Sequence, residues 1–402
     1  MRTAAAIDAE NPPWGDVVRV CLGALATFLA FGMLLPIFPI WVRGYSDNLT
    51  QVGIATTLAA GVGLVAARPL AARMMEGRTR MPTMALGGFC VGFASALYPF
   101  IDGLAPAAHF PAIFTLRAIQ GLGFGLVTTA AVSAITDLTP LHRRGEIIGY
   151  FAASNALALI IGPLIGGGLE KLLDIEVAFW VAGGLAIPSL YFMALVREPG
   201  PAPLPPGSFK LLDAFRFPAL RIVVVGHFAA VILHGALLAF GPLMLDAREG
   251  WMSVEVFFAI EAAAIIAFRI GVGRKFDLYD RLHFVRGGLA LLVIGGLLLG
   301  TVQNDFLLIL TAIIYGLGFG AYVPTMNALV GDIIPGSHRA RGFALFMLAF
   351  DIAIAAGGAI VGPVADRADP QTALLVAAAF PAIALGVYVW GTRRLRIEMS
   401  RR

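Results

Sequence analysis

Apolar residues occur along the chain in long continuous runs, separated by short stretches rich in Gly, Pro and charged residues. A helix needs about 20 residues to cross a hydrocarbon core of about 30 Å, and each run is near that length. The runs are continuous rather than alternating, which favours helices over a membrane barrel. The pattern predicts twelve membrane-spanning helices, six in each half, over residues 17–42, 51–72, 82–101, 109–136, 146–169, 176–195, 220–245, 253–273, 284–301, 306–331, 342–364 and 370–392.

A second pattern, made of charged and small residues, occurs twice along the chain. Residues 68–76 return as residues 269–277, each beginning with an arginine and ending with an acid. The sequence Gly-Leu-Gly-Phe-Gly occupies both 121–125 and 316–320. Two halves built on one plan in an apolar chain are typical of transporters assembled from repeats.

The repeat divides the chain into two predicted helical bundles related by pseudo-symmetry. Residues 1–196 form the first six-helix bundle, and residues 220–402 form the second, which ends in a basic tail. Residues 197–219 form the linker, with five prolines between positions 199 and 206. Proline at this density resists helix formation and makes a semi-rigid spacer, which we expect on the cytoplasmic side.

Composition and charge place the chain in a membrane. Hydrophobic residues make up 59% of it and charged residues 13%, against about 45–50% and about 25% in soluble domains. The net charge is +4. When both termini are placed in the cytoplasm, most of the Lys and Arg residues fall on the cytoplasmic side of the membrane. This positive-inside asymmetry sets topology. We therefore expect a monomeric, multi-pass protein of the cell (inner) membrane, with lipid, protons and a small molecule as its partners and no nucleic acid.

The sequence argues against catalysis. Connections between the predicted spans are short, which leaves no room for a soluble catalytic domain. We find no serine with a positioned histidine, no histidine pair with metalloprotease spacing and no paired catalytic aspartates. The glycine runs lie inside apolar spans, so they do not predict a phosphate-binding loop, and Cys21 and Cys90 are expected to be packed core residues. We expect no enzyme activity, no catalytic residues, no cofactor and no metal.

Three motifs lie at defined places in the first half. The loop after the second predicted span, residues 72–80, contains a small residue, an acid and then arginines. In the fourth span, residues 117–121 read Arg-Ala-Ile-Gln-Gly, and in the fifth, residues 162–167 contain Gly-Pro followed by paired glycines. These motifs resemble the major facilitator superfamily, and within it the twelve-span drug:proton antiporters. In two departures from the family pattern, Ala72 replaces a glycine and Gly77 replaces a basic residue.

The resemblance implies a gate at the loop after the second span and at its second copy. An acid and several arginines at a helix end can pair in one conformation and separate in another. The alternative is that the arginines only hold the loop inside. The candidate gating residues are Arg68, Arg73, Glu76, Arg78, Arg80, Arg269, Gly273 and Asp277.

Glycine and proline in the fifth and eleventh spans suggest close helix packing. Glycines four apart let helices approach each other, and proline frees a backbone carbonyl and allows a bend. The resemblance links this pattern to export, although packing alone explains most of it. The candidate packing residues are Gly162, Pro163, Gly166, Gly167, Gly358 and Gly362.

The two halves differ most at ionisable residues deep in the spans. A charged side chain near the membrane centre costs about 2.5–3.5 kcal/mol on insertion scales, so it should face a cavity or a partner. A carboxylate buried near a cation can exchange a proton, or it can form a static pair. The candidates for proton coupling are Glu261, Asp351, Arg117, His234 and His227. The candidates for polar lining of a substrate cavity are Gln120, Asn155, Tyr315, Tyr322 and Asn327.

These features predict an all-α membrane protein of the major facilitator fold that works as a secondary active transporter by alternating access. The expected activity is proton-coupled efflux of a small, partly apolar molecule or drug. Proton-coupled uptake of a metabolite is the nearest alternative, because it uses the same fold. A non-transporting sensor or an intramembrane enzyme is the remote alternative.

Overall fold

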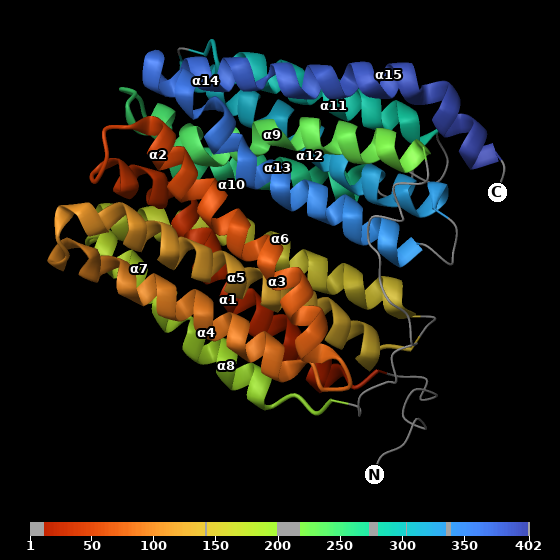
Figure 1. The fold of residues 1–402 in the computed structure, drawn as a ribbon, viewed down its shortest axis with the longest axis horizontal. Helices are drawn as coiled ribbons and strands as arrows, with labels where there is room; N and C mark the ends of the chain where they lie inside the picture. The colour runs from red at the N-terminus through yellow and green to blue at the C-terminus, as the bar shows by residue number, and fades with distance from the viewer. Residues whose placement is uncertain are drawn as a thin grey trace. The chain divides into compact units, whose positions relative to one another are not determined.

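A computed structural model describes residues 12–140, 143–198, 218–272, 280–302, 304–334 and 339–400. Within these ranges every regular element is a helix (Figure 1). Eleven helical segments are long and apolar enough to cross a membrane. The remaining predicted span is α10 (Val254–Val272), a 19-residue helix that carries three charged residues, Glu255, Glu261 and Arg269. The prediction of an all-α membrane protein is confirmed.

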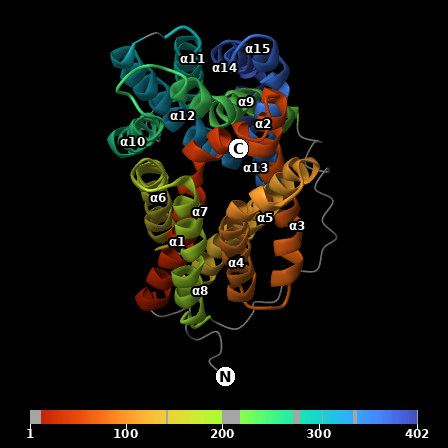
Figure 2. The same cartoon turned by 90° about the vertical axis from the view of Figure 1, so that its left-hand side faces the viewer.

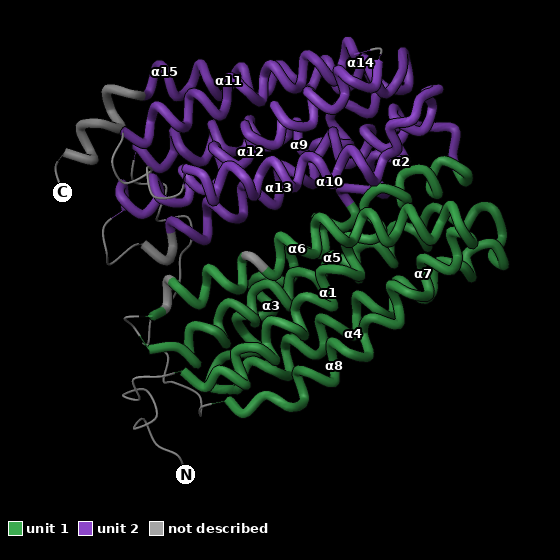
Figure 3. The backbone as a smooth tube through the Cα atoms, turned by 180° about the vertical axis from the view of Figure 1, so that it is seen from behind, with its two compact units in different colours: residues 1–45, 59–206 green, residues 46–58, 207–402 purple. Residues whose placement is uncertain are grey.

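The chain divides into two compact units, residues 1–45 with 59–206 and residues 46–58 with 207–402 (Figure 3). The helices of the first unit are α1 (Trp14–Arg43), α3 (Ala59–Met75), α4 (Met81–Leu97), the 3₁₀ helix η3 (Tyr98–Gly103), α5 (Pro106–Leu138), α6 (Arg144–Leu172), α7 (Ile175–Gly184) and α8 (Ala186–Ala194). Those of the second are α2 (Leu49–Gly53), the π-helix η2 (Ile54–Leu58), α9 (Pro218–Asp246), α10, α11 (Arg281–Leu299), α12 (Asp305–Ile333), α13 (Arg339–Arg367), α14 (Pro370–Ala377) and α15 (Ala379–Ser400). The predicted bundle boundaries stay a prediction, and residues 199–217 of the predicted linker lie outside the described residues.

Two predicted spans are each divided into two helices, for a reason that the sequence contains. The sixth span is α7 followed by α8, and the twelfth is α14 followed by α15. Proline has no N–H to donate to the carbonyl four residues earlier. For Pro188 that carbonyl belongs to Gly184, and for Pro381 it belongs to Ala377, and these are the last residues of α7 and α14.

The second predicted span is shared between the units. Its first part, α2 and η2, packs on α13 and α9 in the second unit, whereas α3 packs on α5 in the first. Asp366 at the end of α13 accepts hydrogen bonds from the backbone N–H groups of Leu49 (2.5 Å) and Thr50 (3.2 Å), which caps the start of α2. A Cβ at Gly53 would lie 2.6 Å from the carbonyl oxygen of Gly358, so glycine permits this close approach. The π-helix coincides with the change of unit.

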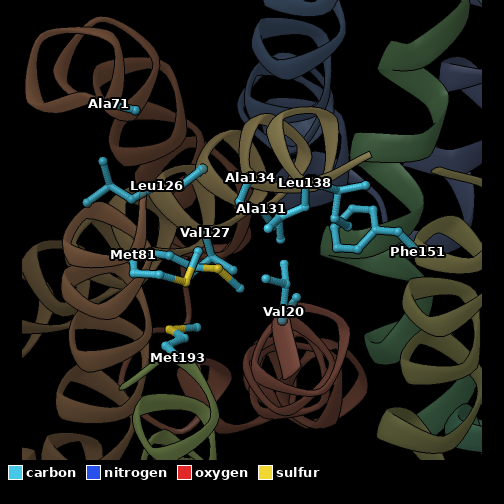
Figure 4. Close-up of a cluster of buried hydrophobic side chains, with 14 of the residues drawn as sticks. Val20, Ala71, Met81, Leu126, Val127, Ala131, Ala134, Leu138, Phe151 and Met193 are labelled. Atoms are coloured by element: carbon cyan, nitrogen blue, oxygen red, sulfur yellow. The ribbon is translucent and has the colours of Figure 1, made fainter. Parts of the chain in front are cut away.

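A buried apolar cluster holds the first unit together (Figure 4). Val20 of α1, Leu126 of α5 and Met193 of α8 are among its members, and all are almost fully buried. Helix α4 packs against α7 and α8, and the three are neighbours in Figures 1 and 2. Because lipid tails are as apolar as these side chains, the cluster is held together by close van der Waals packing. This packing fixes α5, which carries Arg117.

Candidate coupling, gating and substrate sites

Arg117 lies in the middle of α5, with 2% of its surface exposed. Its Nη1 donates to Oε1 of Gln120 at 2.5 Å, and its guanidinium lies 4.3 Å from the ring centre of Phe38 and 5.0 Å from that of Phe31. A cation over an aromatic face is stabilised by the ring quadrupole, more strongly when water is excluded. The aromatic rings of α1 therefore contribute to holding this charge inside the unit.

Gln120 completes the surroundings of Arg117. Its Oε1 also accepts from the hydroxyl of Tyr98 at 3.3 Å, and its Nε2 donates to Oγ of Ser95 at 2.9 Å. Gln120 is fully buried. It was expected to line a substrate cavity, which stays a prediction, and in this structure it accepts a hydrogen bond from the coupling candidate Arg117. Ser95 and Tyr98 were not predicted, because a single hydroxyl in an apolar span gives no pattern in the sequence.

The repeated glycines of the second unit bring three candidate residues together. A Cβ at Gly316 of α12 would overlap the backbone oxygen of Glu261 on α10, so these helices are in backbone contact. The neighbouring residue, Tyr315, places its hydroxyl 3.2 Å from Nδ1 of His234 on α9. The same Nδ1 lies 3.8 Å from Oε1 of Glu261. Three predicted residues from three helices therefore meet in one place.

Glu261 occupies an unusual environment at this site. Only 3% of its surface is exposed, and its Oε1 has no hydrogen-bond partner among the described residues. The imidazole of His234 stacks on the ring of Phe319 at 4.3 Å between centres. An ionised carboxylate would be costly here unless it gained a cation or a hydrogen bond, and a protonated carboxyl would be neutral. This arrangement suits a group that changes charge.

His227 lies two turns away from His234 on α9. Its Nδ1 is 3.1 Å from the hydroxyl of Tyr322, which is 3.4 Å from the hydroxyl of Tyr388. Tyr388 donates to the carbonyl oxygen of Val223 at 3.0 Å. The imidazole stacks on Phe346 with 4.0 Å between ring centres. This histidine therefore lies among aromatic side chains. Its described contacts include no ion pair with an acid.

The remaining polar candidates place buried polar atoms in both units. Asp351 of α13 has 4% of its surface exposed. The side-chain oxygens of Asn155 on α6 and Asn327 on α12 are buried and have no hydrogen-bond partner among the described residues. An unsatisfied buried carbonyl costs about 1–3 kcal/mol. Both amides are therefore suited to accept a hydrogen bond from a bound molecule.

A polar network surrounds Arg80 at the start of α4. Its Nε donates to Oδ2 of Asp137 at 2.9 Å, and its Nη1 donates to the carbonyl oxygens of Met75 (2.7 Å) and Arg78 (2.8 Å). The carboxylate of Glu198 accepts from the backbone N–H groups of Arg80 (2.5 Å) and Met81. Burial raises the pKa of Glu198 from its ordinary value, while these hydrogen bonds oppose the shift.

The second unit repeats the central ion pair of this network. Nη1 of Arg281 lies 2.5 Å from Oδ2 of Asp332. Asp137 and Asp332 stand at the same distance after the two glycine runs, so the pairs occupy matching places in the repeat. Sequence reasoning did not assign Asp137, Glu198, Arg281 or Asp332, and the matching acids were the available signal.

The other gating and packing candidates are placed as follows. Arg73, Glu76, Arg78 and Arg269 are exposed, Arg68 donates to Oγ1 of Thr129 at 3.2 Å, and Gly273 and Asp277 lie outside the described residues. A Cβ at Gly162 would lie 3.0 Å from the backbone of Gly32, and one at Gly166 would overlap the carbonyl oxygen of Met33, so α6 lies directly on α1. Pro163 and Gly167 are buried in α6. In α13, a Cβ added at Gly362 would lie 2.8 Å from Cα of Thr50.

Comparison with known proteins identifies the family. The model of the Major Facilitator Superfamily matches residues 20–357 and 258–398. This chain belongs to the major facilitator superfamily. It is therefore a multi-pass membrane transporter of the major facilitator fold and not an enzyme.

Similar members of the superfamily include a multi-drug efflux pump and a quinolone resistance protein. The chain is 23% identical over 374 residues to the multi-drug resistance efflux pump PmrA of Streptococcus pneumoniae, covering 88% of this chain and 89% of that protein. It is 22% identical over 329 residues to the quinolone resistance protein NorA of Staphylococcus aureus, covering 79% and 81%. Among solved structures, a bacterial homolog of the human lysosomal transporter Spinster matches with a TM-score of 0.79 at 14% identity, covering 96% and 99%.

Proposed function

We propose that this transporter exports a small, partly apolar molecule or drug in exchange for protons, by alternating access. The observation that carries the proposal is the buried approach of Glu261 to His234, 3.8 Å apart in the second unit. The names of the relatives support export, because PmrA is an efflux pump and NorA is a quinolone resistance protein. The proposed location is the cell (inner) membrane with both termini cytoplasmic, and the proposed form is a monomer without a nucleic-acid partner.

Proton binding would change the charge of the Glu261 site. A proton on the carboxyl makes it neutral, which removes its attraction for an imidazolium and lowers the cost of its burial. Release of the proton restores the attraction. A proton shifts the balance between two conformations only through its different affinity for them. A site whose partners lie on α9, α10 and α12 is suited to this, because small helix movements change the distances among them.

Within the first unit, the substrate is proposed to meet Asn155, whose buried side-chain oxygen has no hydrogen-bond partner among the described residues. Arg117 is proposed as a further charge that the transport cycle uses. The aromatic faces around it, Phe31 and Phe38, favour a flat or partly apolar molecule as a neighbour. This is the substrate class that the proposal assigns.

The proposal is tested by an imposed pH gradient in vesicles containing only the purified protein, with a fluorescent quinolone as the probe. A proton gradient directed opposite to probe movement is expected to drive the probe against its own gradient, and an ionophore that collapses the proton gradient should stop it. Probe accumulation on the side opposite the proton source, in the direction of proton flow, indicates proton-coupled uptake instead. Probe movement whose rate and direction do not depend on the proton gradient contradicts proton coupling.

The gate is proposed to be the network of Arg80, Asp137 and Glu198 rather than Glu76 alone. It ties the loop before α4 to the end of α5 and to the segment after α8. An ion pair between partly buried groups is less screened than one in open water. Its making or breaking would therefore bias the balance between inward- and outward-open states.

Asp137→Asn is expected to change the rate at which a reporter cysteine at Asn327 is labelled from the cytoplasmic side. Loss of a charge-assisted hydrogen bond, discounted for the partial exposure of Asp137, gives about a threefold change. The measurement uses a background without Cys21 and Cys90. Glu146→Gln is the control, since it removes an exposed pair with Arg143 of the same length, 2.9 Å. Equal labelling in Asp137→Asn and the parent would remove the gating role.

A further inference from the structure

Two histidine–tyrosine contacts link α9 to α12. His227 contacts Tyr322, and His234 contacts Tyr315. The histidines are seven residues apart, and so are the tyrosines, in opposite order along the chain. Seven residues are about two helical turns, which places both histidines on one face of α9. The two contacts therefore use the same residue types in the same geometry and differ only in what lies beyond them.

The contact at His227 has a fixed direction of hydrogen bonding. The carbonyl of Val223 can only accept, so the single hydroxyl proton of Tyr388 is donated to it. The oxygen of Tyr388 then accepts from Tyr322, whose own oxygen is left to accept from Nδ1–H of His227. A backbone carbonyl that does not titrate thus sets every proton in this chain. The direction of each hydrogen bond at this contact is therefore expected to stay the same throughout transport.

The contact at His234 ends at a group that can titrate. Nδ1 of His234 lies 3.2 Å from the hydroxyl of Tyr315 and 3.8 Å from Oε1 of Glu261. The first distance is within hydrogen-bonding range and the second is beyond it. One ring nitrogen forms one good hydrogen bond, so the hydroxyl occupies the nitrogen that Glu261 would otherwise use. Oε1 of Glu261 is consequently left without a hydrogen bond among the described residues.

We infer that Tyr315 is a positioning residue that keeps the imidazole of His234 from bonding to Glu261 and so keeps the carboxyl easy to protonate. The inference rests on the proposed proton coupling and names the group that adjusts it. It assigns Tyr315, expected from the sequence to line a substrate cavity, to the coupling site. Tyr322, the matching tyrosine, is expected to have no such effect, because the described contacts of His227 are with tyrosine and phenylalanine side chains and include no acid.

The titratable groups around His234 are few. Glu261 approaches it from α10 and Tyr315 from α12. The other buried titratable groups on the elements packed against α9 are His227 on α9 itself, Tyr322 on α12, Asp351 on α13 and Tyr388 on α15. The sequences of α2, η2 and α14 contain none. The effect of the Tyr315 hydroxyl is therefore exerted mainly on the His234–Glu261 pair.

The test is the pH profile of quinolone transport in vesicles for Tyr315→Phe. Without the hydroxyl, Nδ1–H is free to donate to the carboxylate, which stabilises the charged form. The midpoint of the profile is expected to move about one pH unit toward acid, a tenfold change in proton activity. Tyr322→Phe is the matched control, with an unmoved midpoint. Exchange of labelled for unlabelled quinolone at equal concentrations, which needs no proton gradient, is measured in both variants to establish that they are folded and bind the quinolone.

Each other outcome is informative. An unmoved or alkaline midpoint in Tyr315→Phe, or an equal acid shift in Tyr322→Phe, overturns the inference. Tyr315→Met removes the same hydroxyl and decides the matter if the Phe variant does not fold. If Glu261→Gln keeps gradient-driven transport, the proposed coupling itself is wrong. If Glu261→Gln loses it and the Tyr315 variants show no shift, only the role of Tyr315 is wrong.

Discussion

Glu261→Gln is expected to reduce pH-gradient-driven transport of the quinolone to less than about a tenth of the parent rate, because an amide keeps the size and hydrogen-bonding capacity of the carboxyl and carries no exchangeable charge. Exchange at equal concentrations should remain. The measurement compares the two modes in the same vesicle preparation. Loss of the driven mode with retention of exchange separates a coupling defect from misfolding or lost binding.

Asp351→Asn is the control that decides which acid carries the proton. Asp351 is buried to a similar extent in the same unit, with 4% of its surface exposed against 3% for Glu261. We expect Asp351→Asn to keep gradient-driven transport, because Glu261 is the acid that lies 3.8 Å from the imidazole of His234. The reverse pattern, with transport lost in Asp351→Asn and kept in Glu261→Gln, would move the coupling site to α13.

Much of the fold could be predicted from the sequence, because bilayer thickness leaves little freedom. A continuous apolar run in hydrocarbon must pair its own backbone N–H and C=O groups, which a helix does, so the pattern alone predicted helices. Pro188 and Pro381 account for the breaks at Gly184 and Ala377, but they did not predict them, because Pro36 and Pro163 lie inside unbroken helices. The π-helix at Ile54–Leu58 could not, since it coincides with packing on α13 and α9 that no local pattern encodes.

The candidate site was predictable in part, and the limit is physical. The repeat drew attention to Glu261 and His234, because their counterparts Ala60 and Phe31 are apolar. It did not predict that they approach each other, since that depends on Gly316 lying against the backbone of Glu261. The partner of Arg117 was visible as Gln120 three residues later, which is a local relation. The hydrogen bonds of Gln120 with Ser95 of α4 and Tyr98 of η3 join different elements, so no local pattern predicts them.

The glycine runs at 121–125 and 316–320 let α5 and α12 each pack closely on two neighbouring helices, which the sequence alone did not show. In the first unit Gly121 lies against Ala60 of α3, while Gly123 lies against Gly87 of α4 with 2.5 Å from its ideal Cβ to the carbonyl oxygen. In the second unit Gly316 lies against Glu261 of α10 and Gly318 against Gly288 of α11. Alternate glycines thus let one helix pack on two neighbours at once. This explains why the run occurs in both halves.

Gly121→Ala is expected to lower the stability of the first unit by at least about 3 kcal/mol, because both sides of the contact are backbone. The added Cβ would overlap the carbonyl oxygen of Ala60, and Gly63 forms the matching contact with Ala118. No side-chain rotation relieves such an overlap, so α3 and α5 must separate or slide. That movement would also displace Arg117, four residues earlier on α5, from its contacts on α1.

The control for this prediction is Gly168→Ala in α6, where nothing lies within 4 Å of an added Cβ. Alanine is the better helix former by about 1 kcal/mol, so this variant should be neutral or slightly more stable. Thermal denaturation of the detergent-solubilised proteins, followed by size-exclusion chromatography, compares the two. Ala60→Gly should not rescue Gly121→Ala, because the contact is with the carbonyl oxygen and not with the side chain. Equal stability of the two glycine variants would mean that α3 and α5 are not held in backbone contact, and that Arg117 is positioned by α1 and α4 alone.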